Sequence, residues 1–288
     1  MKRRITDVLI VLVILVGLGF LLYPAFSDQW NKFQQSRQIN EYDLVVREME
    51  TEDFSEEWEK ARAFNESLVE NDIFRDVFGT GTAELEDTEY WDVLNLNGDG
   101  IMGYIEIPKI HEKLSIYHGT GDDVLQTGVG HVNGSKLPIG GDGNHTVLAA
   151  HRGLPSAKLF TDIDQLVPGD KFYIVVLDEV LAYEVDLVHD MVDKNDIETL
   201  SDIMAIVEGE DLVTLFTCTP YGINSHRLLV RGRRVEYNGE LEVEVPVTEA
   251  MVESIQNYYV FYSILGVAIA GLILVVVKVV AKKKKQKN

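Results

Sequence analysis

The chain carries an apolar segment near each end, and these two segments limit what the rest of it can fold into. The first covers residues 8–23 and follows three basic residues; the second covers residues 258–281 and precedes a run of lysines. A helix of about 20 residues crosses the roughly 30 Å hydrocarbon core of a bilayer. Because basic residues beside a span stay in the cytoplasm, we expect both termini inside the cell and the middle outside.

The first apolar segment is also compatible with a secretory signal peptide. Its run is longer than the apolar region of most such peptides, and no Ala-x-Ala cleavage site follows in residues 23–27. We therefore expect an uncleaved membrane anchor over residues 1–26. The second transmembrane helix is expected over residues 258–281, with a basic cytoplasmic tail over 282–288.

The part of the chain between the two apolar segments is strongly acidic. The whole chain has 26 basic and 47 acidic residues, and many of the basic ones lie at its ends. Such a charge repels phosphate backbones, so nucleic acid is excluded as a partner. The chain has one cysteine, which rules out an intramolecular disulfide framework.

The sequence pattern changes from helical to β-rich along the chain. Within residues 27–75, Trp58, Ala61, Phe64 and Leu68 recur three and four apart, which predicts one long or two shorter amphipathic helices. Many short strands then indicate a mainly β domain, a closed or nearly closed β-barrel over residues 99–240. The expected strands are 101–108, 114–117, 146–150, 171–177, 181–188, 212–218 and 226–236, with one helix at 196–207. Residues 27–98 form the helical segment, and 241–257 a linker.

The stretch at residues 214–232, TLFTCTPYGINSHRLLVRG, predicts two strands joined by a turn. The first strand ends near Cys218, and Arg227 lies at the start of the second. A thiol at a strand end, facing a cation, is one way to expose and activate a nucleophile. The plainer interpretation is a buried apolar cysteine and a surface arginine.

This stretch resembles the signature of the sortase family, transpeptidases whose active-site strand reads Thr-Leu-x-Thr-Cys, with a catalytic arginine on the next strand. The residues after Cys218 are similar to those of the class C, pilus-assembling sortases. The resemblance covers roughly residues 101–236. It implies an eight-stranded barrel with the site at one edge, and the second membrane anchor is also typical of the class.

A cysteine nucleophile needs a group that accepts and later donates a proton, usually a histidine. Among seven histidines, His151 ends an apolar run and His226 is close to Cys218, and spacing alone cannot choose between them. The resemblance selects His151, because class C sortases carry the catalytic histidine in the stretch that residues 151–161 match. It implies that Cys218 is the nucleophile, that His151 is its acid–base partner and that Arg227 stabilises the oxyanion, with His226 a structural neighbour.

Two further features are expected around the site. Thr217 and Thr219, on either side of Cys218, are expected to shape the substrate groove. Class C sortases usually cover the site with a lid that carries an Asp-Pro-aromatic motif, and Asp76 and Phe78 stand at the corresponding place with valine between them. Valine restricts the loop less than proline, so the lid is expected to open up to about fivefold more readily. The alternative is that these residues form a helix-end turn that packs on the barrel.

The resemblance implies an extracellular enzyme of a Gram-positive cell that cleaves a Leu-Pro-x-Thr-Gly-type signal between Thr and Gly. It then transfers the acyl group to a lysine amine of a pilin subunit. A sortase that anchors proteins to a peptidoglycan precursor would share all three catalytic residues. Outside the enzymes, the alternative is a membrane-tethered adhesin or scaffold. A papain-like hydrolase is disfavoured, because its cysteine opens a helix and precedes its histidine.

Residues 95–106 match the ligand spacing of an EF-hand calcium loop, with Asn95 at the first position and Glu106 at the last. The residues around Glu106 alternate like a strand, so no exiting helix is expected and a plain turn is the preferred interpretation. One cysteine and scattered histidines do not give the ligand spacing of a zinc site. We therefore expect no metal and no cofactor.

Overall fold

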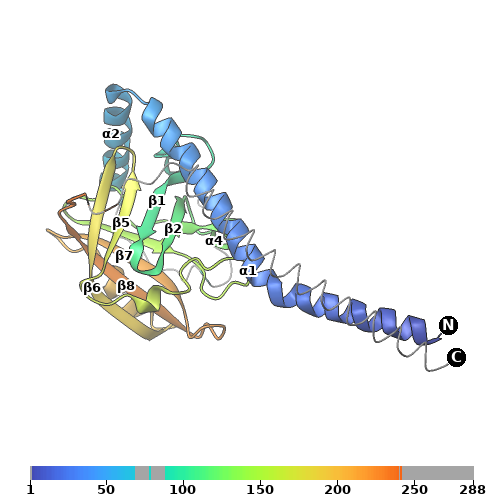
Figure 1. Ribbon diagram of the computed structural model, residues 1–288. Helices are drawn as coiled ribbons and strands as arrows, with labels where there is room; N and C mark the ends of the chain where they lie inside the picture. The colour runs from blue at the N-terminus through green and yellow to red at the C-terminus, as the bar shows by residue number, and fades with distance from the viewer. Residues whose placement is uncertain (1, 69–77, 79–87, 240, 242–288) are drawn as a thin grey trace. The chain divides into compact units, whose positions relative to one another are not determined.

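The computed structural model describes residues 2–68, 78, 88–239 and 241 (Figure 1). The chain divides into two compact units, Met1–Gly19 with Asn238–Asn288, and Phe20–Tyr237. In the first unit the structure describes chiefly the beginning of helix α1 (Lys2–Glu48). The second unit holds the rest of α1 and the β-rich domain.

Helix α1 is the one described helix that is long and apolar enough to cross a membrane, over Val11–Glu48. It continues through Pro24, where the missing N–H removes a single backbone hydrogen bond. With α2 (Thr51–Ser67), it confirms the helical prediction for the described part of residues 27–75. The predicted second span, residues 258–281, lies outside the described residues.

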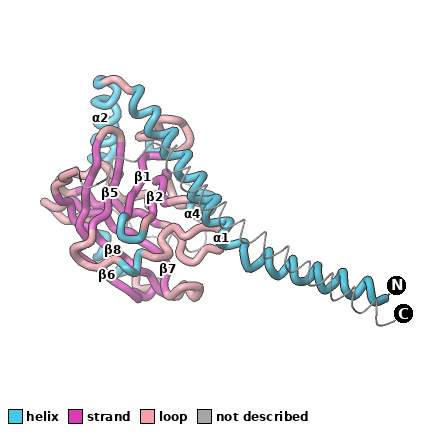
Figure 2. The backbone as a smooth tube through the Cα atoms, viewed as in Figure 1, coloured by secondary structure: helices cyan, strands magenta, loops and turns pink. Residues whose placement is uncertain are grey.

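Eight strands close into a barrel in the order β1-β2-β3-β4-β7-β8-β6-β5. Several of these strands can be followed in Figures 1 and 2. The pairs β2–β3 and β4–β7 are parallel, and the other neighbours are antiparallel. This confirms the predicted eight-stranded, mainly β fold. The strands are β1 (Ile101–Ile107), β2 (Glu112–Tyr117), β3 (Val129–His131), β4 (Asn144–Ala149), β5 (Lys171–Val176), β6 (Glu179–Asp193), β7 (Asp211–Thr219) and β8 (His226–Val235).

The sequence pattern misses the shortest elements. Strand β3 has three residues, too few to show alternation, and it pairs with β2 and β4 through the backbone. The helix predicted at 196–207 is present as α5 (Ile197–Met204), and the Asp196 carboxylate accepts a hydrogen bond from the Thr199 N–H at its start. The other missed elements are α3 (Thr88–Asp92), α4 (Asp122–Thr127) and the 3₁₀ turns η1 (Pro108–Ile110) and η2 (Ile163–Gln165).

Strands β7 and β8 send alternate side chains to the two faces of the barrel wall. Leu215 and Leu228 belong to the large cluster of buried apolar side chains that fills the barrel. Phe216 and Leu229 belong to a second cluster, on the outer face. Residues 216 and 218 of β7 therefore point to the outer face.

The part of α1 beyond Phe20 is fixed against the barrel by buried polar side chains. The Gln35 amide, 2% exposed, donates to the Thr127 carbonyl at 2.6 Å and accepts from the Ser115 N–H at 2.7 Å. The Tyr42 hydroxyl donates to the Met102 carbonyl at 3.1 Å. Because buried polar groups are costly when they lack partners, these bonds define one position of the helix along β1 and β2.

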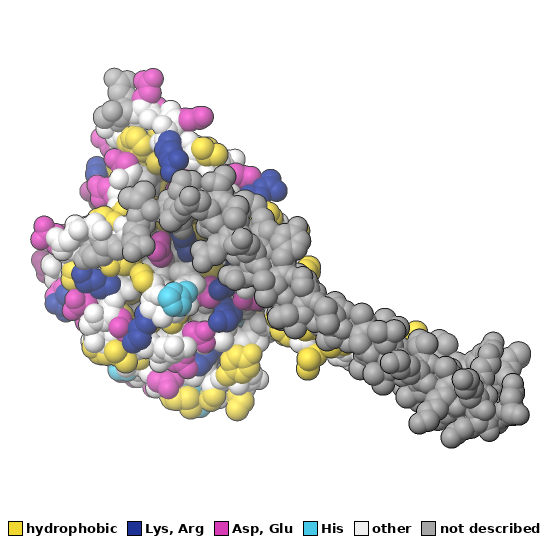
Figure 3. All heavy atoms as spheres, in the orientation of Figure 1, with side chains coloured by type: hydrophobic (Ala, Val, Ile, Leu, Met, Phe, Trp, Pro, Cys, Tyr) yellow, Lys and Arg dark blue, Asp and Glu magenta, His cyan; other side chains and the backbone are white. Residues whose placement is uncertain are grey.

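Charged side chains of both signs cover the barrel surface. Figure 3 shows acidic and basic side chains interspersed on the part of one face that is coloured, with apolar side chains between them. The formal net charge of the whole chain is −21.

Candidate active site

Strands β7 and β8 place Cys218 and Arg227 directly opposite each other. The antiparallel register pairs Cys218 with Arg227 and Phe216 with Leu229. Directly opposed residues in such a ladder extend their side chains from the same face, with Cβ atoms about 4.5–5.5 Å apart. The thiol and the guanidinium group therefore share the outer face of the barrel wall.

The Arg227 side chain is almost fully buried, 2% exposed, and its direction is fixed by the turn that connects β7 to β8. Its Nη1 donates to the Asn224 carbonyl at 3.1 Å and to the His226 carbonyl at 2.9 Å. Cys218 is 4% exposed. Because the turn holds it, the guanidinium group stays on the face that carries the thiol without any rearrangement.

His151 lies just beyond the end of β4, beside β7. The parallel ladder pairs Ala149 with Phe216, and the Ala150 N–H donates to the Phe216 carbonyl at 3.2 Å. The next residue, His151, is half-buried. Burial lowers the pKa of its imidazole, and the Asp122 carboxylate acts in the opposite direction. The structure thus brings His151 to the end of β7 that carries Cys218.

The ring of Phe78 contacts three groups around this site. Its centroid lies 5.5 Å from the His151 ring and 5.3 Å from the Phe216 ring, and the Arg227 Cζ lies 5.5 Å from it. Asp76, the other residue of the predicted lid, lies outside the described residues. An aromatic ring is therefore packed against both the histidine and the arginine.

Thr217 and Thr219 lie on the other face of β7 from Cys218, because side chains alternate along a strand. The Thr217 hydroxyl donates to the Ala150 carbonyl at 2.7 Å, and the Thr219 hydroxyl donates to Asp190 Oδ1 at 3.3 Å. These hydroxyls are engaged with the protein. A role for the two residues in a substrate groove stays a prediction, and it would act through the shape of the strand end.

His226 precedes Arg227 on β8 and therefore points to the opposite face. Its Nδ1 lies 2.8 Å from the Ser225 Oγ. Three other histidines are buried in the barrel domain: His118, His131 and His145. Each has hydrogen-bond partners on both ring nitrogens. These contacts indicate structural roles.

Residues 95–100 form a turn that leads into β1. The Asn95 Oδ1 accepts from the Gly100 N–H at 2.8 Å, and the Asp99 Oδ1 accepts from the Ile101 N–H at 3.1 Å. Glu106 lies on β1, where its Oε2 is 3.9 Å from the Lys113 Nζ. Within the part of the chain that the structure describes, no group of three or more His, Cys, Asp or Glu side chains could hold a metal ion. These contacts favour the turn interpretation.

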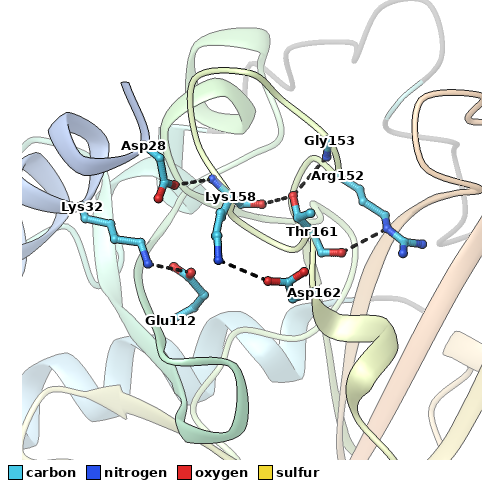
Figure 4. A network of polar contacts seen from close by, with 8 residues as sticks. All are labelled: Asp28, Lys32, Glu112, Arg152, Gly153, Lys158, Thr161 and Asp162. Carbon is cyan, nitrogen blue, oxygen red and sulfur yellow. Dashed lines mark hydrogen bonds and ion pairs between the residues drawn. The ribbon is translucent and has the colours of Figure 1, made fainter. Parts of the chain in front are cut away.

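Arg152 follows His151 directly, and its residue type and spacing in the sequence do not mark it as part of the site. Its side chain is 9% exposed and contacts Thr161, Asp164 and Thr219, and Figure 4 shows part of this network. The local signal is an arginine directly after the predicted histidine. Its partners in η2 and at the end of β7 could not be read from spacing.

A thiol, an imidazole and a fixed guanidinium group in one place are the groups that acyl transfer requires. The thiolate is a strong nucleophile, the imidazole exchanges protons, and the guanidinium group donates hydrogen bonds to a developing oxyanion. The three groups come from the ends of three strands: β4, β7 and β8.

Comparison with known proteins agrees with this chemistry. Residues 105–235 match the sortase domain. Sortase A of Bacillus anthracis is 26% identical over 233 residues, which are 80% of this chain and 95% of that protein. Sortase D of Bacillus subtilis is 31% identical over 136 residues, which are 46% of this chain and 63% of that protein.

Solved structures of class C sortases are more similar. The crystal structure of Streptococcus pneumoniae sortase C, described with reference to pilin substrate specificity, is 44% identical with a TM-score of 0.62, over 71% of this chain and all of that one. Sortase C1 of Streptococcus agalactiae is 43% identical with a TM-score of 0.61, over 70% of this chain and all of that one. The chain therefore belongs to the sortase family, the cysteine transpeptidases. Within the family its structural neighbours define it as a class C sortase.

Proposed function

We propose that this sortase cleaves a Leu-Pro-x-Thr-Gly-type sorting signal between Thr and Gly and joins the acyl fragment to a lysine amine of a pilin subunit. The observation that carries the proposal is the register that pairs Cys218 with Arg227, with His151 at the adjoining end of β4. Pilin substrates are supported by the neighbours, which include a pilus-related sortase C of Group B Streptococcus at 35% identity.

In the first half-reaction the Cys218 thiolate attacks the carbonyl carbon of the signal's Thr. The tetrahedral oxyanion receives hydrogen bonds from Arg227, whose guanidinium group is already oriented by two backbone carbonyls. The Thr–Gly C–N bond then breaks, and His151 gives its proton to the departing glycine amine. The products are an acyl thioester on Cys218 and a neutral His151.

In the second half-reaction a neutral lysine amine attacks the thioester carbonyl. His151 takes the proton that the amine loses, and the C–S bond breaks to return the Cys218 thiolate. An isopeptide bond joins the two subunits, and the enzyme is back in its starting protonation state. The half-buried position of His151 suits this exchange, because burial lowers its pKa and eases release of the proton.

We further propose that Phe78 forms part of a lid over the site. Its ring lies against the His151 ring and beside the Arg227 guanidinium group, so it occupies space next to the thiol. Asp76 would complete the lid by pairing with Arg227. The lid would have to move before a sorting signal could reach Cys218.

The proposed layout places the catalytic domain outside the cell. Residues 1–26 would anchor it at one end and residues 258–281 at the other, with both termini in the cytoplasm. The apolar part of α1 supports the first anchor. Reporter fusions test the topology: one after Asn288 should be cytoplasmic, and one inserted at Asn238 should be extracellular.

The proposed reaction is tested by incubating the full-length enzyme with a purified pilin that carries the sorting signal. Wild type should release the peptide that begins with Gly and form pilin polymers whose isopeptide bond is found by mass spectrometry. Cys218→Ala should do neither, and His151→Ala should lose nearly all of both activities. Transfer to a peptidoglycan precursor in place of pilin lysine would contradict the proposed acceptor and leave the cleavage chemistry standing.

A further inference from the structure

Arg152 links the segment that carries His151 to the strand that carries Cys218. Its guanidinium group is nearly buried, with the side chain 9% exposed. It donates from Nε to the Thr161 carbonyl at 3.1 Å, from Nη1 to the Thr219 hydroxyl at 3.1 Å, and from Nη2 to the Asp164 carboxylate. One side chain thus reaches three separate places in the fold.

The bond to Thr161 closes the loop that begins at His151. Two backbone donors close the same loop: the Phe160 N–H bonds to the His151 carbonyl at 3.2 Å, and the Gly153 N–H to the Thr161 hydroxyl at 3.1 Å. These contacts are made within the loop, and part of them can be followed in Figure 4. They hold the loop's shape without fixing its distance from β7.

The bond to Thr219 supplies a connection to β7. Thr219 follows Cys218 directly, and its hydroxyl accepts from Arg152 while it donates to Asp190 on β6. A hydroxyl can donate one hydrogen bond and accept another, so the two bonds can form at the same time, from Arg152 to Thr219 and from Thr219 to Asp190. It approaches β7 from the face opposite the thiol, where it does not occupy the catalytic space.

We propose that Arg152 is a positioning residue, which sets the distance and angle between the His151 imidazole and the Cys218 thiol. The inference rests on the proposed roles of those two residues. Lysine could keep the charge but not the three diverging bonds, because only a guanidinium group has a rigid fork of donors. A misplacement of about 1 Å between reacting groups can cost as much as 10²-fold in rate.

The matched control is Arg231, four residues beyond Arg227 on β8. It forms a similar two-point contact with Asp186, at 3.1 Å from Nε and 2.8 Å from Nη2. Arg231→Gln removes a charged, hydrogen-bonded contact from the barrel wall and leaves the contacts of the loop at 151–161 unchanged. A purely structural role for Arg152 would therefore make Arg152→Gln and Arg231→Gln alike.

The test uses the full-length protein in detergent and three measurements. The first is cleavage of a fluorogenic Leu-Pro-Glu-Thr-Gly peptide, the second is alkylation of Cys218 by iodoacetamide between pH 5 and 9, and the third is the thermal midpoint. Arg152→Gln should lower kcat about 10- to 100-fold with KM changed less than about twofold, and should shift the pH profile of alkylation. Thr219→Val should show the same kind of loss, Thr219→Ser should restore most of kcat, and Arg231→Gln should keep kcat and the pH profile.

Wild-type kcat and an unchanged alkylation profile in Arg152→Gln would overturn the inference. So would equal losses of kcat in Arg152→Gln and Arg231→Gln at equal losses of thermal midpoint. If Arg152→Gln does not fold, Thr219→Val and Thr219→Ser decide: equal kcat in the two variants overturns the inference. Failure of the proposed function would look different. Wild-type enzyme would then not cleave the peptide, while the alkylation profiles of wild type and Arg152→Gln would still differ.

Discussion

The two sides of the proposed active site are held in place by different means. Cys218 and Arg227 are opposite residues of one antiparallel ladder, so the backbone hydrogen bonds of β7 and β8 fix their separation. His151 has left the ladder of β4 and begins a loop, and the position of this loop depends on side-chain contacts as well as on single backbone bonds. We expect the first arrangement to tolerate substitutions outside the pair. The second depends on several residues that take no part in the chemistry.

On the ladder side, a large effect should come from a conservative change of the guanidinium group. Arg227→Lys keeps the charge but loses the forked donors that the Asn224 and His226 carbonyls orient. Loss of one oxyanion donor typically costs about 10²–10³-fold in kcat, and we expect a loss of that size in peptide cleavage. Arg231→Lys serves as the control. Near wild-type cleavage by Arg227→Lys would remove Arg227 from the oxyanion role.

The barrel wall should also give the protein a pH-dependent stability. Burial lowers the pKa of His131 and of His145 to about 4 each. The unfolded chain has an ordinary histidine pKa near 6.5, so it binds more protons between about pH 6.5 and 4, and stability should fall as the pH falls through that window. At about 1.4 kcal/mol per pKa unit, each histidine could account for up to about 3 kcal/mol.

This pH effect can be assigned by urea unfolding at several pH values. His145→Gln should reduce the dependence between pH 6.5 and 4 and leave the part that His131 contributes. Burial raises the pKa of Glu112 and of Asp211 above their ordinary values of 4.5 and 3.8. These two carboxyl groups therefore favour the folded state as the pH falls towards those values, which opposes the effect of the histidines. A free energy of unfolding that stays constant from pH 7 to pH 5 would contradict the assignment.

The proposed lid spans both sides of the site, since the Phe78 ring touches His151 and lies beside Arg227. Asp76→Ala combined with Phe78→Ala should raise the iodoacetamide reaction rate of Cys218. Val77→Pro should lower it by up to about fivefold, because proline makes the closed loop less costly to order. Trp30→Ala, a change of an exposed aromatic residue on α1, is the control. If both lid variants react with iodoacetamide at the wild-type rate, the lid proposal is wrong, and the catalytic assignment is unaffected.

The loop side should respond to changes on α1 as well. The Asp28 carboxylate accepts from the Lys158 N–H at 2.8 Å, within the loop that His151 begins (Figure 4). Asp28→Ala should reduce kcat, by less than Arg152→Gln does, and should cost about 1 kcal/mol of stability. Asn31→Ala, which removes a bond from the same helix to the Thr127 carbonyl, should cost similar stability and leave kcat unchanged. Equal kcat in the two variants would confine the loop's support to Arg152.

The smallest effect is expected at His226, the histidine that spacing could not distinguish from His151. It points away from the thiol and lies beside Ser225. His226→Ala should keep most of the cleavage activity. A loss comparable with that of His151→Ala would show that the wrong histidine has been chosen.

The part of the site on the β7–β8 ladder could be predicted from the sequence more fully than the part on the loop that begins at His151. The strand–turn–strand pattern around Cys218 and Arg227 is local, so their pairing and the β-barrel were predictable, whereas β3 has only three residues and shows no pattern. The choice of His151 needed the family resemblance, because its approach to Cys218 depends on β4 and β7, which lie far apart in the chain. The contacts of Arg152 with Thr219 and Asp164 are also non-local, and no spacing in the sequence indicates them.

The most direct test of the central claim is mass spectrometry of the enzyme after incubation with a pilin in which the acceptor lysine has been acetylated. Without an amine acceptor the acyl-enzyme should accumulate, and peptide mapping should find the pilin fragment that ends in Thr bonded to Cys218 through a hydroxylamine-sensitive thioester. Cys218→Ala should show no such adduct. Cleavage of the signal by wild type and Cys218→Ala alike would contradict the account.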